Sequence, residues 1–84
     1  MSEAAPGVAL SELGIGQGGK ITALDLPGEA KQRLLEMGMT VGARIEVVRF
    51  APLGDPVDIK VRGYHLSIRK HEAAGILVEM TNDQ

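Results

Sequence analysis

The sequence predicts a mainly β domain, a small barrel, closed or partly open, of about five short strands with one helix inserted after the first strand. Residues 57–61 and 64–68 alternate apolar and polar side chains, with the period of two that is typical of half-buried strands. Residues 29–37 instead have the 3.6-residue period of an amphipathic helix. With 84 residues, of which 44% are apolar, the chain is long enough for one folded domain only.

The N-terminal part of the chain is irregular. Residues 1–9 are small, include proline and glycine, and are predicted to form a flexible arm before a domain at residues 10–80. At most one helical turn follows Ser11, because glycines at positions 14, 16, 18 and 19 interrupt the chain. Gly18 and Gly19 are expected to open the first strand, in which apolar and polar side chains alternate over residues 20–24, and a turn follows it.

The helix predicted over residues 29–37 is supported by its apolar stripe and by both ends. Ala30, Leu34 and Met37 lie on one face. Glu29 lies in the first turn, where the helix dipole favours an anion, and Gly38 stands where a left-handed C-cap residue belongs. Leu34 is therefore expected to centre the stripe that covers the barrel.

Three further strands are predicted after the helix. Residues 44–50 alternate until positions 48 and 49, where a bulge is expected, and the proline-rich residues 51–56 form a loop. Arg62 and Gly63 are predicted to form the turn of a hairpin. This turn pairs apolar residues on one face: Val61 with Tyr64, Ile59 with Leu66 and Val57 with Ile68.

The end of the domain is predicted from a similar pattern. Residues 70–74 can form one short helical turn, and a closing strand follows Gly75. Ile76, Val78 and Met80 are expected to face inward in this strand. Residues 81–84 are expected to be a C-terminal tail.

Composition excludes several classes of protein. Without cysteine there is no disulfide, no zinc-thiolate site and no thiol nucleophile, which favours a reducing compartment. The longest uncharged stretch, residues 4–11, is far shorter than the roughly 20 residues that cross a bilayer, so we expect a cytoplasmic protein without direct membrane insertion. Basic residues outnumber acidic ones six to three in residues 44–71, but one Phe, one Tyr and no Trp offer little for nucleic acid to stack on.

Few residues could support catalysis or bind a cofactor. Ser11 and Ser67 lack a base held by a third group, so we expect no enzyme. The glycine-rich residues 14–19 precede a strand and do not open a helix, which disfavours phosphate binding. The candidate ligands for a divalent metal are His65, His71 and Glu72, although their spacing matches no known motif and surface histidines are the simpler interpretation.

Two surfaces could bind a partner. The first is an electrostatic patch of outward-facing cations, for which a solvated face is the simpler interpretation: Lys60, Arg62, Arg69 and Lys70. The second is the loop at residues 52–56, where prolines stiffen the segment around apolar Leu53; the alternative is that the loop only connects two strands.

Several motifs resemble the ferrous iron transport protein A (FeoA) family from Leu10 to Glu79. They are L-S-E-L followed by glycines, R-L-L-E-M-G-M, A-P-L-G-D-P, R-G-Y-H-L-S-I-R and E-A-A-G-I. The resemblance implies an SH3-like barrel with an inserted helix. It also implies a small cytoplasmic protein that works with FeoB, the membrane transporter of ferrous iron, which carries a cytoplasmic GTP-binding domain.

The leading hypothesis is a non-catalytic accessory module of bacterial ferrous iron uptake that binds and regulates FeoB. Its expected contacts are the helix end and the loop: Met37, Met39, Pro52, Leu53, Gly54, Asp55 and Pro56. One alternative is a metal-binding or metal-sensing protein that uses the candidate ligands above. Another is a GTPase-activating factor that offers Arg62 or Arg69 to the nucleotide site. We expect that no cofactor is required and that zinc would bind only opportunistically. Whether the protein forms a homo-oligomer stays open.

Overall fold

The computed structural model describes residues 7–80, and it contains six strands, two α-helices and one 3-10 helix. In chain order the elements are β1 (Val8–Ala9), η1 (Leu10–Glu12), β2 (Gly18–Leu24), α1 (Gly28–Glu36), β3 (Arg44–Phe50), β4 (Val57–Val61), β5 (Tyr64–Ile68), α2 (Lys70–Ala73) and β6 (Ile76–Met80). The expected arm and tail include residues 1–6 and 81–84, which lie outside the described residues. The last two residues of the expected arm form β1.

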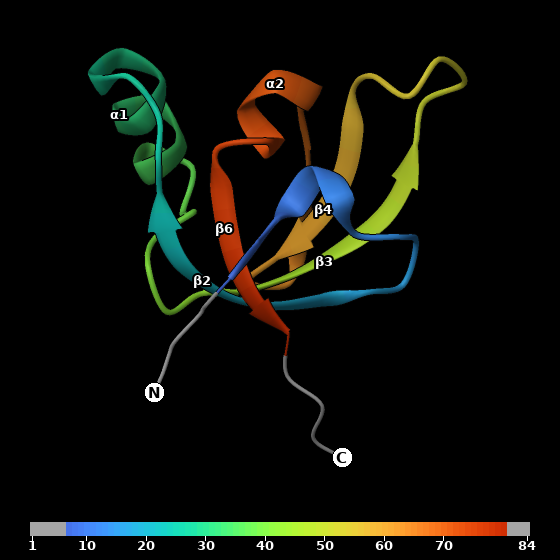
Figure 1. The fold of residues 1–84 in the computed structure, drawn as a ribbon, viewed down its shortest axis with the longest axis horizontal. Coiled ribbons are helices and arrows are strands. Elements are labelled where there is room, and N and C mark those ends of the chain that lie inside the picture. The colour runs from blue at the N-terminus through green and yellow to red at the C-terminus, as the bar shows by residue number, and fades with distance from the viewer. Residues whose placement is uncertain (1–6, 81–84) are drawn as a thin grey trace.

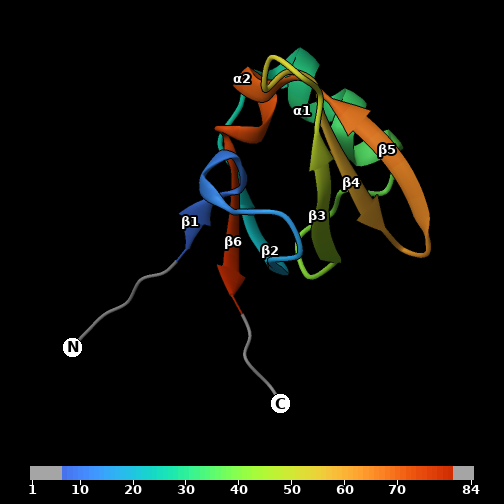
Figure 2. The ribbon, with the colours of Figure 1, turned by 90° about the vertical axis from the view of Figure 1, so that its right-hand side faces the viewer.

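The strands form one antiparallel sheet in the order β1-β6-β2-β3-β4-β5. The sheet curves around a single core, with α1 and α2 at one end of it (Figure 1). Turned by 90°, the molecule shows β1 and β5 on opposite sides (Figure 2). Among residues 7–80 these are the two outer strands, so the barrel is partly open. The mainly β prediction is confirmed, with a sixth strand that the sequence did not reveal.

The core is built from strands β2 to β6, from η1, α1 and α2, and from loop residues beside them. Side chains with 8% exposure or less form it: Leu10, Leu13, Ile21, Leu24, Leu34, Met39, Ala43, Ile45, Val47, Val57, Ile59, Val61, Ile68, Ala73, Ile76 and Val78. Burial of this apolar surface is the main force that stabilises the fold. No helix among residues 7–80 is long and apolar enough to span a membrane.

The β4–β5 hairpin has the predicted register. Val61 pairs with Tyr64 and Val57 with Ile68, around a turn in which Arg62 has a φ of 51° and Gly63 a φ of 87°. Positive φ at both positions is the geometry of a type I′ turn. The predicted face is only partly buried, however, because β5 is an outer strand: Tyr64 remains 48% exposed and Leu66 is half-buried.

The ends of two other strands can be compared with expectation. β2 begins at Gly18, with the pair of glycines that was predicted to open it. A Cβ at Gly18 or Gly19 would overlap a backbone carbonyl oxygen of the neighbouring β3 or β6. These glycines therefore permit close strand approach. Met80, expected to face inward at the end of β6, is 46% exposed. The bulge predicted in β3 is confirmed by a register shift between Val47 and Arg49.

Helix α1 ends as its sequence predicts. Gly38 follows the C-cap residue Met37 and adopts a φ of 93°. Its N–H donates to the carbonyl oxygen of Leu35, and the Met39 N–H donates to that of Leu34, both at 3.0 Å. This pair of bonds is a Schellman motif. It turns the chain so that Leu34 and Met39 both enter the core, each with 0% exposure.

Candidate functional site

The loop between β3 and β4 holds one apolar side chain in solvent. Leu53 is 93% exposed. The loop closes on itself through two backbone hydrogen bonds, from Ala51 N–H to the Pro56 carbonyl at 3.0 Å and from Gly54 N–H to the Ala51 carbonyl at 2.7 Å. Gly54 has the positive φ of 86° that the turn requires. The predicted exposed segment is thus a defined loop that presents Leu53.

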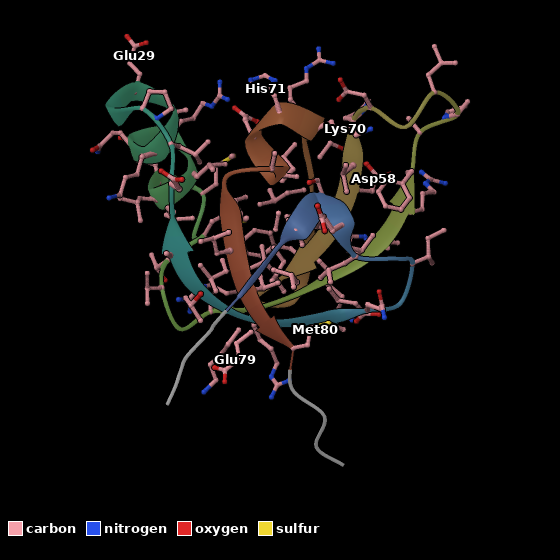
Figure 3. The ribbon with its side chains drawn as sticks, viewed as in Figure 1. Glu29, Asp58, Lys70, His71, Glu79 and Met80 are labelled. Atoms are coloured by element: carbon pink, nitrogen blue, oxygen red, sulfur yellow. The ribbon has the colours of Figure 1, made fainter. Side chains whose placement is uncertain are left out.

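Asp55 attaches this loop to α2. Its Oδ1 accepts a hydrogen bond from the backbone N–H of Lys70 at 2.9 Å and lies 4.0 Å from the Arg69 guanidinium. Lys70 is the first residue of α2, and the N–H groups in the first turn of a helix have no acceptor within the helix. Asp55 therefore supplies an acceptor for one of these N–H groups in addition to being part of the loop. Figure 3 shows Lys70 and His71 at this end of the molecule.

Glu72 is buried in contacts that hold the fold together, and the prediction that it is a metal ligand is wrong. Its side chain is 3% exposed, accepts a hydrogen bond from the Arg69 N–H at 3.1 Å and forms an ion pair with Arg33 of α1. A buried carboxylate requires such partners. Within residues 7–80 no group of three or more His, Asp or Glu side chains could hold a metal ion, and His65 lies near the start of β5 whereas His71 lies in α2, beyond the other end of that strand.

The tip of the β4–β5 hairpin binds the C-terminal end of α1. Arg62 donates from Nε to the Gly38 carbonyl at 3.1 Å and from Nη2 to the Thr40 hydroxyl at 2.9 Å. The Tyr64 hydroxyl donates to the Met37 carbonyl at 3.1 Å. These donors satisfy carbonyls beyond the last helical turn. The sequence shows that such carbonyls need donors, but it contains no signal of which distant side chains supply them.

The helix end offers less surface than expected. Met39 is wholly buried, so its assignment as a contact residue is wrong: the turn at Gly38 directs its side chain into the core. Met37 is half-buried and packs against the core. Arg62, expected to be a free cation, is engaged in the two hydrogen bonds to the helix end.

The four cations of the expected patch do not form one surface. Lys60 and Arg62 lie at the hairpin turn, whereas Arg69 and Lys70 lie beyond the other end of β5. A strand advances about 3.3 Å per residue, so Arg62 and Arg69 are separated by roughly 20 Å. Lys60 also stands opposite Glu46 on β3 and lines a hollow of about 420 Å³ with Arg44 and Arg62. Only Arg69 and Lys70 adjoin the loop that carries Leu53.

A polar network crosses the outer face of β3, β4 and β5. Asp58 accepts hydrogen bonds from the Ser67 hydroxyl at 2.6 Å and from Arg49 Nε at 3.0 Å. These two hydrogen bonds, the one from Ser67 first, lower the pKa of Asp58 below its ordinary value of 3.8. The network joins three strands across a hollow of about 460 Å³ that His65 also lines. Its donors and acceptors bond to one another, which indicates a structural role.

Known proteins share both this sequence and this architecture. A fusion of Fe(2+) transport protein A with the Fe(2+) transporter FeoB, from Porphyromonas gingivalis, is 42% identical over 71 residues, which is 84% of this chain and 8% of the fusion protein. The chain thus spans a small part of that relative.

Solved structures give the same assignment. A FeoA-like protein of Clostridium acetobutylicum superposes with a TM-score of 0.86 at 33% identity, covering 96% of this chain and 94% of that one. The FeoA of Stenotrophomonas maltophilia, an SH3 domain protein crystallised with zinc, superposes with a TM-score of 0.71 at 27% identity, covering 83% and 87% of the two chains. The model of the FeoA domain family matches residues 8–80, and the chain therefore belongs to the FeoA family.

Proposed function

We propose that this protein is a non-catalytic accessory module of ferrous iron uptake, which binds the cytoplasmic side of FeoB and regulates it. The observation that carries the proposal is the Porphyromonas gingivalis fusion, in which transport protein A and FeoB are one polypeptide. A covalent link holds two domains at a high effective concentration, which favours their association without any new contact. A separate chain of the same family would achieve that association through its surface.

The loop between β3 and β4 is the surface that best suits this role. Leu53 is 93% exposed, and the loop's backbone hydrogen bonds limit the freedom that it loses on binding. Pro52 lies beside Leu53 and is also exposed, while Gly54 and Pro56 are half-buried and shape the loop. Met37 is a secondary candidate, because part of its side chain reaches the surface beside α1.

Co-purification tests the proposal directly. Affinity-tagged protein is mixed with full-length FeoB in detergent, and the retained FeoB is compared with that of a folded SH3 domain of unrelated sequence. We expect retention with this chain only. GTP hydrolysis and iron uptake by reconstituted FeoB are then measured with and without the protein. A change in either rate, upward or downward, supports regulation, and unchanged rates with no retention would refute the proposal.

The Stenotrophomonas maltophilia FeoA was crystallised with zinc, and metal binding is therefore the second property to test. In this chain Glu72 is paired with Arg33, which leaves His65 and His71 on the surface. We propose that no cofactor is required and that zinc binds these histidines only opportunistically. Titration with zinc or ferrous iron, followed by calorimetry, should show weak binding that changes neither folding nor FeoB binding. Tight stoichiometric binding would favour a metal-sensing role.

The arginine-finger alternative is restricted by the structure. Arg62 donates hydrogen bonds to the Gly38 carbonyl and the Thr40 hydroxyl, so acting as an arginine finger would require it to release both bonds. Arg69 is exposed and lies 4.0 Å from Asp55, and it is the remaining candidate of the two. If Arg69→Lys abolished any stimulation of GTP hydrolysis while FeoB binding persisted, the protein would act as a GTPase-activating factor.

A further inference from the structure

We propose that Leu53 and the first turn of α2 form one docking surface, and that its receptor on FeoB is an apolar pocket flanked by carboxylates. This surface, called here the loop–α2 surface, consists of Leu53, Arg69 and Lys70. The inference rests on the proposed function and specifies the chemistry of its partner. Three observations carry it: the exposure of Leu53, the bond that fixes the loop to α2, and the charge at that end of the molecule.

Leu53 is presented as a preorganised apolar knob. At 93% exposure it is the most exposed large apolar side chain among residues 7–80, ahead of Ile15 at 66% and Val41 at 64%. The hydrogen bonds within the loop hold its backbone in one shape. An apolar side chain fixed in this way gains most when it enters a pocket that removes it from water, because little conformational entropy is lost on docking.

Arg69 and Lys70 lie next to the loop that carries Leu53, because Asp55 joins the loop to the start of α2. The carboxylate of Asp55 binds the backbone N–H of Lys70 and lies 4.0 Å from the Arg69 guanidinium. Arg69, Lys70 and the adjacent His71 are all exposed. Figure 3 shows Lys70 and His71 at this end, with Glu29 over α1 on the other side of α2.

The acidic residues of this region cancel its positive charge only in part. Glu72 is buried in its ion pair with Arg33. Asp55 is exposed and lies 4.0 Å from Arg69, so it offsets part of the charge of that guanidinium, whereas its contact with Lys70 is to the backbone N–H and leaves the charge of the Lys70 side chain in place. The loop–α2 surface therefore combines an apolar centre with a cationic border. Complementary charge on a partner, that is, carboxylates around a pocket, would steer association and fix its orientation.

A lipid bilayer is the rival receptor for an apolar side chain among cations. Stable adsorption to a membrane takes two anchoring signals, such as an acyl chain together with a polybasic cluster. The loop–α2 surface offers one leucine and two cations, with a histidine beside them. These features suit a pocket of defined shape better than a bilayer surface, because one well-packed side chain can dominate binding to a protein.

The apolar part is tested by truncation with a matched control. The probe is FeoB in nanodiscs of neutral phosphatidylcholine, and the affinity of the full-length protein is measured by surface plasmon resonance. Leu53→Ala should weaken binding about 10- to 100-fold. Ile15→Ala removes a side chain of the same size from another exposed site and should change the affinity less than about twofold. Thermal unfolding should show that both variants remain folded.

The charged part is tested by kinetics. Lys70→Glu should slow association with FeoB about three- to tenfold at low salt, and the difference should shrink as salt screens the charges. Lys31→Glu makes the same charge change on the exposed face of α1 and serves as the control. Equal effects of Lys70→Glu and Lys31→Glu would show that only net charge matters and would overturn the assignment of α2.

The outcomes separate the inference from the proposed function. If the unmodified protein does not bind FeoB, the proposed function fails. If it binds but Leu53→Ala and Ile15→Ala bind equally well, the proposed function stands and the loop–α2 surface is wrong. The protein is also mixed with phosphatidylglycerol vesicles that lack FeoB. Binding to these vesicles that is lost in Leu53→Ala would identify a membrane as the receptor and overturn the inference.

Discussion

The β4–β5 hairpin and helix α1 are held in the fold by different means. In the hairpin, Val57, Ile59, Val61 and Ile68 are at most 2% exposed, and backbone pairing sets their positions. Helix α1 has one fully buried residue, Leu34. Its remaining attachments include the ion pair of Arg33 with Glu72 and the hydrogen bonds that the hairpin tip donates to carbonyls after the helix.

The comparison shows how two neighbouring segments can differ in what stabilises them. Apolar burial is distributed over the hairpin, so the loss of one side chain there leaves others in place. In α1 burial is concentrated at a single position, and partly exposed polar contacts complete the attachment. The exposed hydrogen bonds among these contacts contribute modestly, because both partners can bond to water when they separate. We therefore expect α1 to open at lower free energy than the hairpin.

The largest expected effect comes from removing the one buried side chain of α1. Leu34→Ala should lower the free energy of unfolding by about 2–5 kcal/mol, the range for truncating a buried leucine. A domain of this size has little stability to spare, so much of the protein should unfold at 37 °C. Urea denaturation followed by circular dichroism measures the change. Leu35→Ala, at a neighbouring position that is 36% exposed, is the control and should cost much less. Equal effects would contradict the concentration of burial at Leu34.

The hairpin should be most sensitive at its turn. Gly63 has a φ of 87°, which a β-branched residue adopts only with strain, so Gly63→Val should destabilise by about 1–3 kcal/mol. A Cβ at Gly63 would meet no other atom, so the cost arises from the backbone alone. Gly28→Ala, at the first residue of α1 where a Cβ is also free of contacts, should be neutral or stabilising. A chemical denaturation midpoint for Gly63→Val equal to the parent would mean that the turn is not type I′.

A smaller change distinguishes the two regions directly. Tyr64→Phe removes the hydrogen bond to the Met37 carbonyl and should cost about 0.5–1.5 kcal/mol. Hydrogen exchange should accelerate at amides of α1 while the amides of β4 keep their protection. Uniform acceleration in both segments would show that α1 and the hairpin open together, as one cooperative unit.

The smallest effect concerns pH and the network at Asp58. The pKa of Asp58 is lowered in the folded state, so its contribution to stability is present above the ordinary value of 3.8 and is lost as pH falls through the lower folded value. Ser67→Ala removes the main cause of that shift. The difference in urea midpoint between parent and variant should therefore be greater at about pH 7 than at about pH 2.5. A difference that is independent of pH would show that the Ser67 hydroxyl does not act through the Asp58 carboxylate.

Much of the fold could be predicted because local patterns and burial agree. Alternation in residues 57–68 specified the hairpin register, and Gly38 marked the end of α1. β1 could not be predicted, since its two residues are too short to show a period and are held by pairing with β6. The pair of glycines marked the start of β2, but the reason for them was hidden in the sequence: a Cβ at Gly18 or Gly19 would overlap the backbone of β3 or β6.

The candidate site was less predictable than the fold. Exposure of the loop at Leu53 followed from its composition, but its attachment to α2 through Asp55 joins residues 15 positions apart. Glu72 and Arg62 resembled available functional groups in the sequence. Their partners, Arg33 and Gly38, are distant in the chain and become neighbours only in the folded state. Charge alone does not reveal whether a side chain is free.

The pairing of β1 with β6 bears on how the domain can be joined to other chains. Val8 lies opposite Val78, so the first and last described strands run side by side. Figure 3 shows Met80 at the end of the molecule opposite His71 and Lys70. The described chain thus enters β1 and leaves β6 at the same end of the domain. A domain joined to the chain before β1 or after β6 would connect at the end opposite the loop–α2 surface.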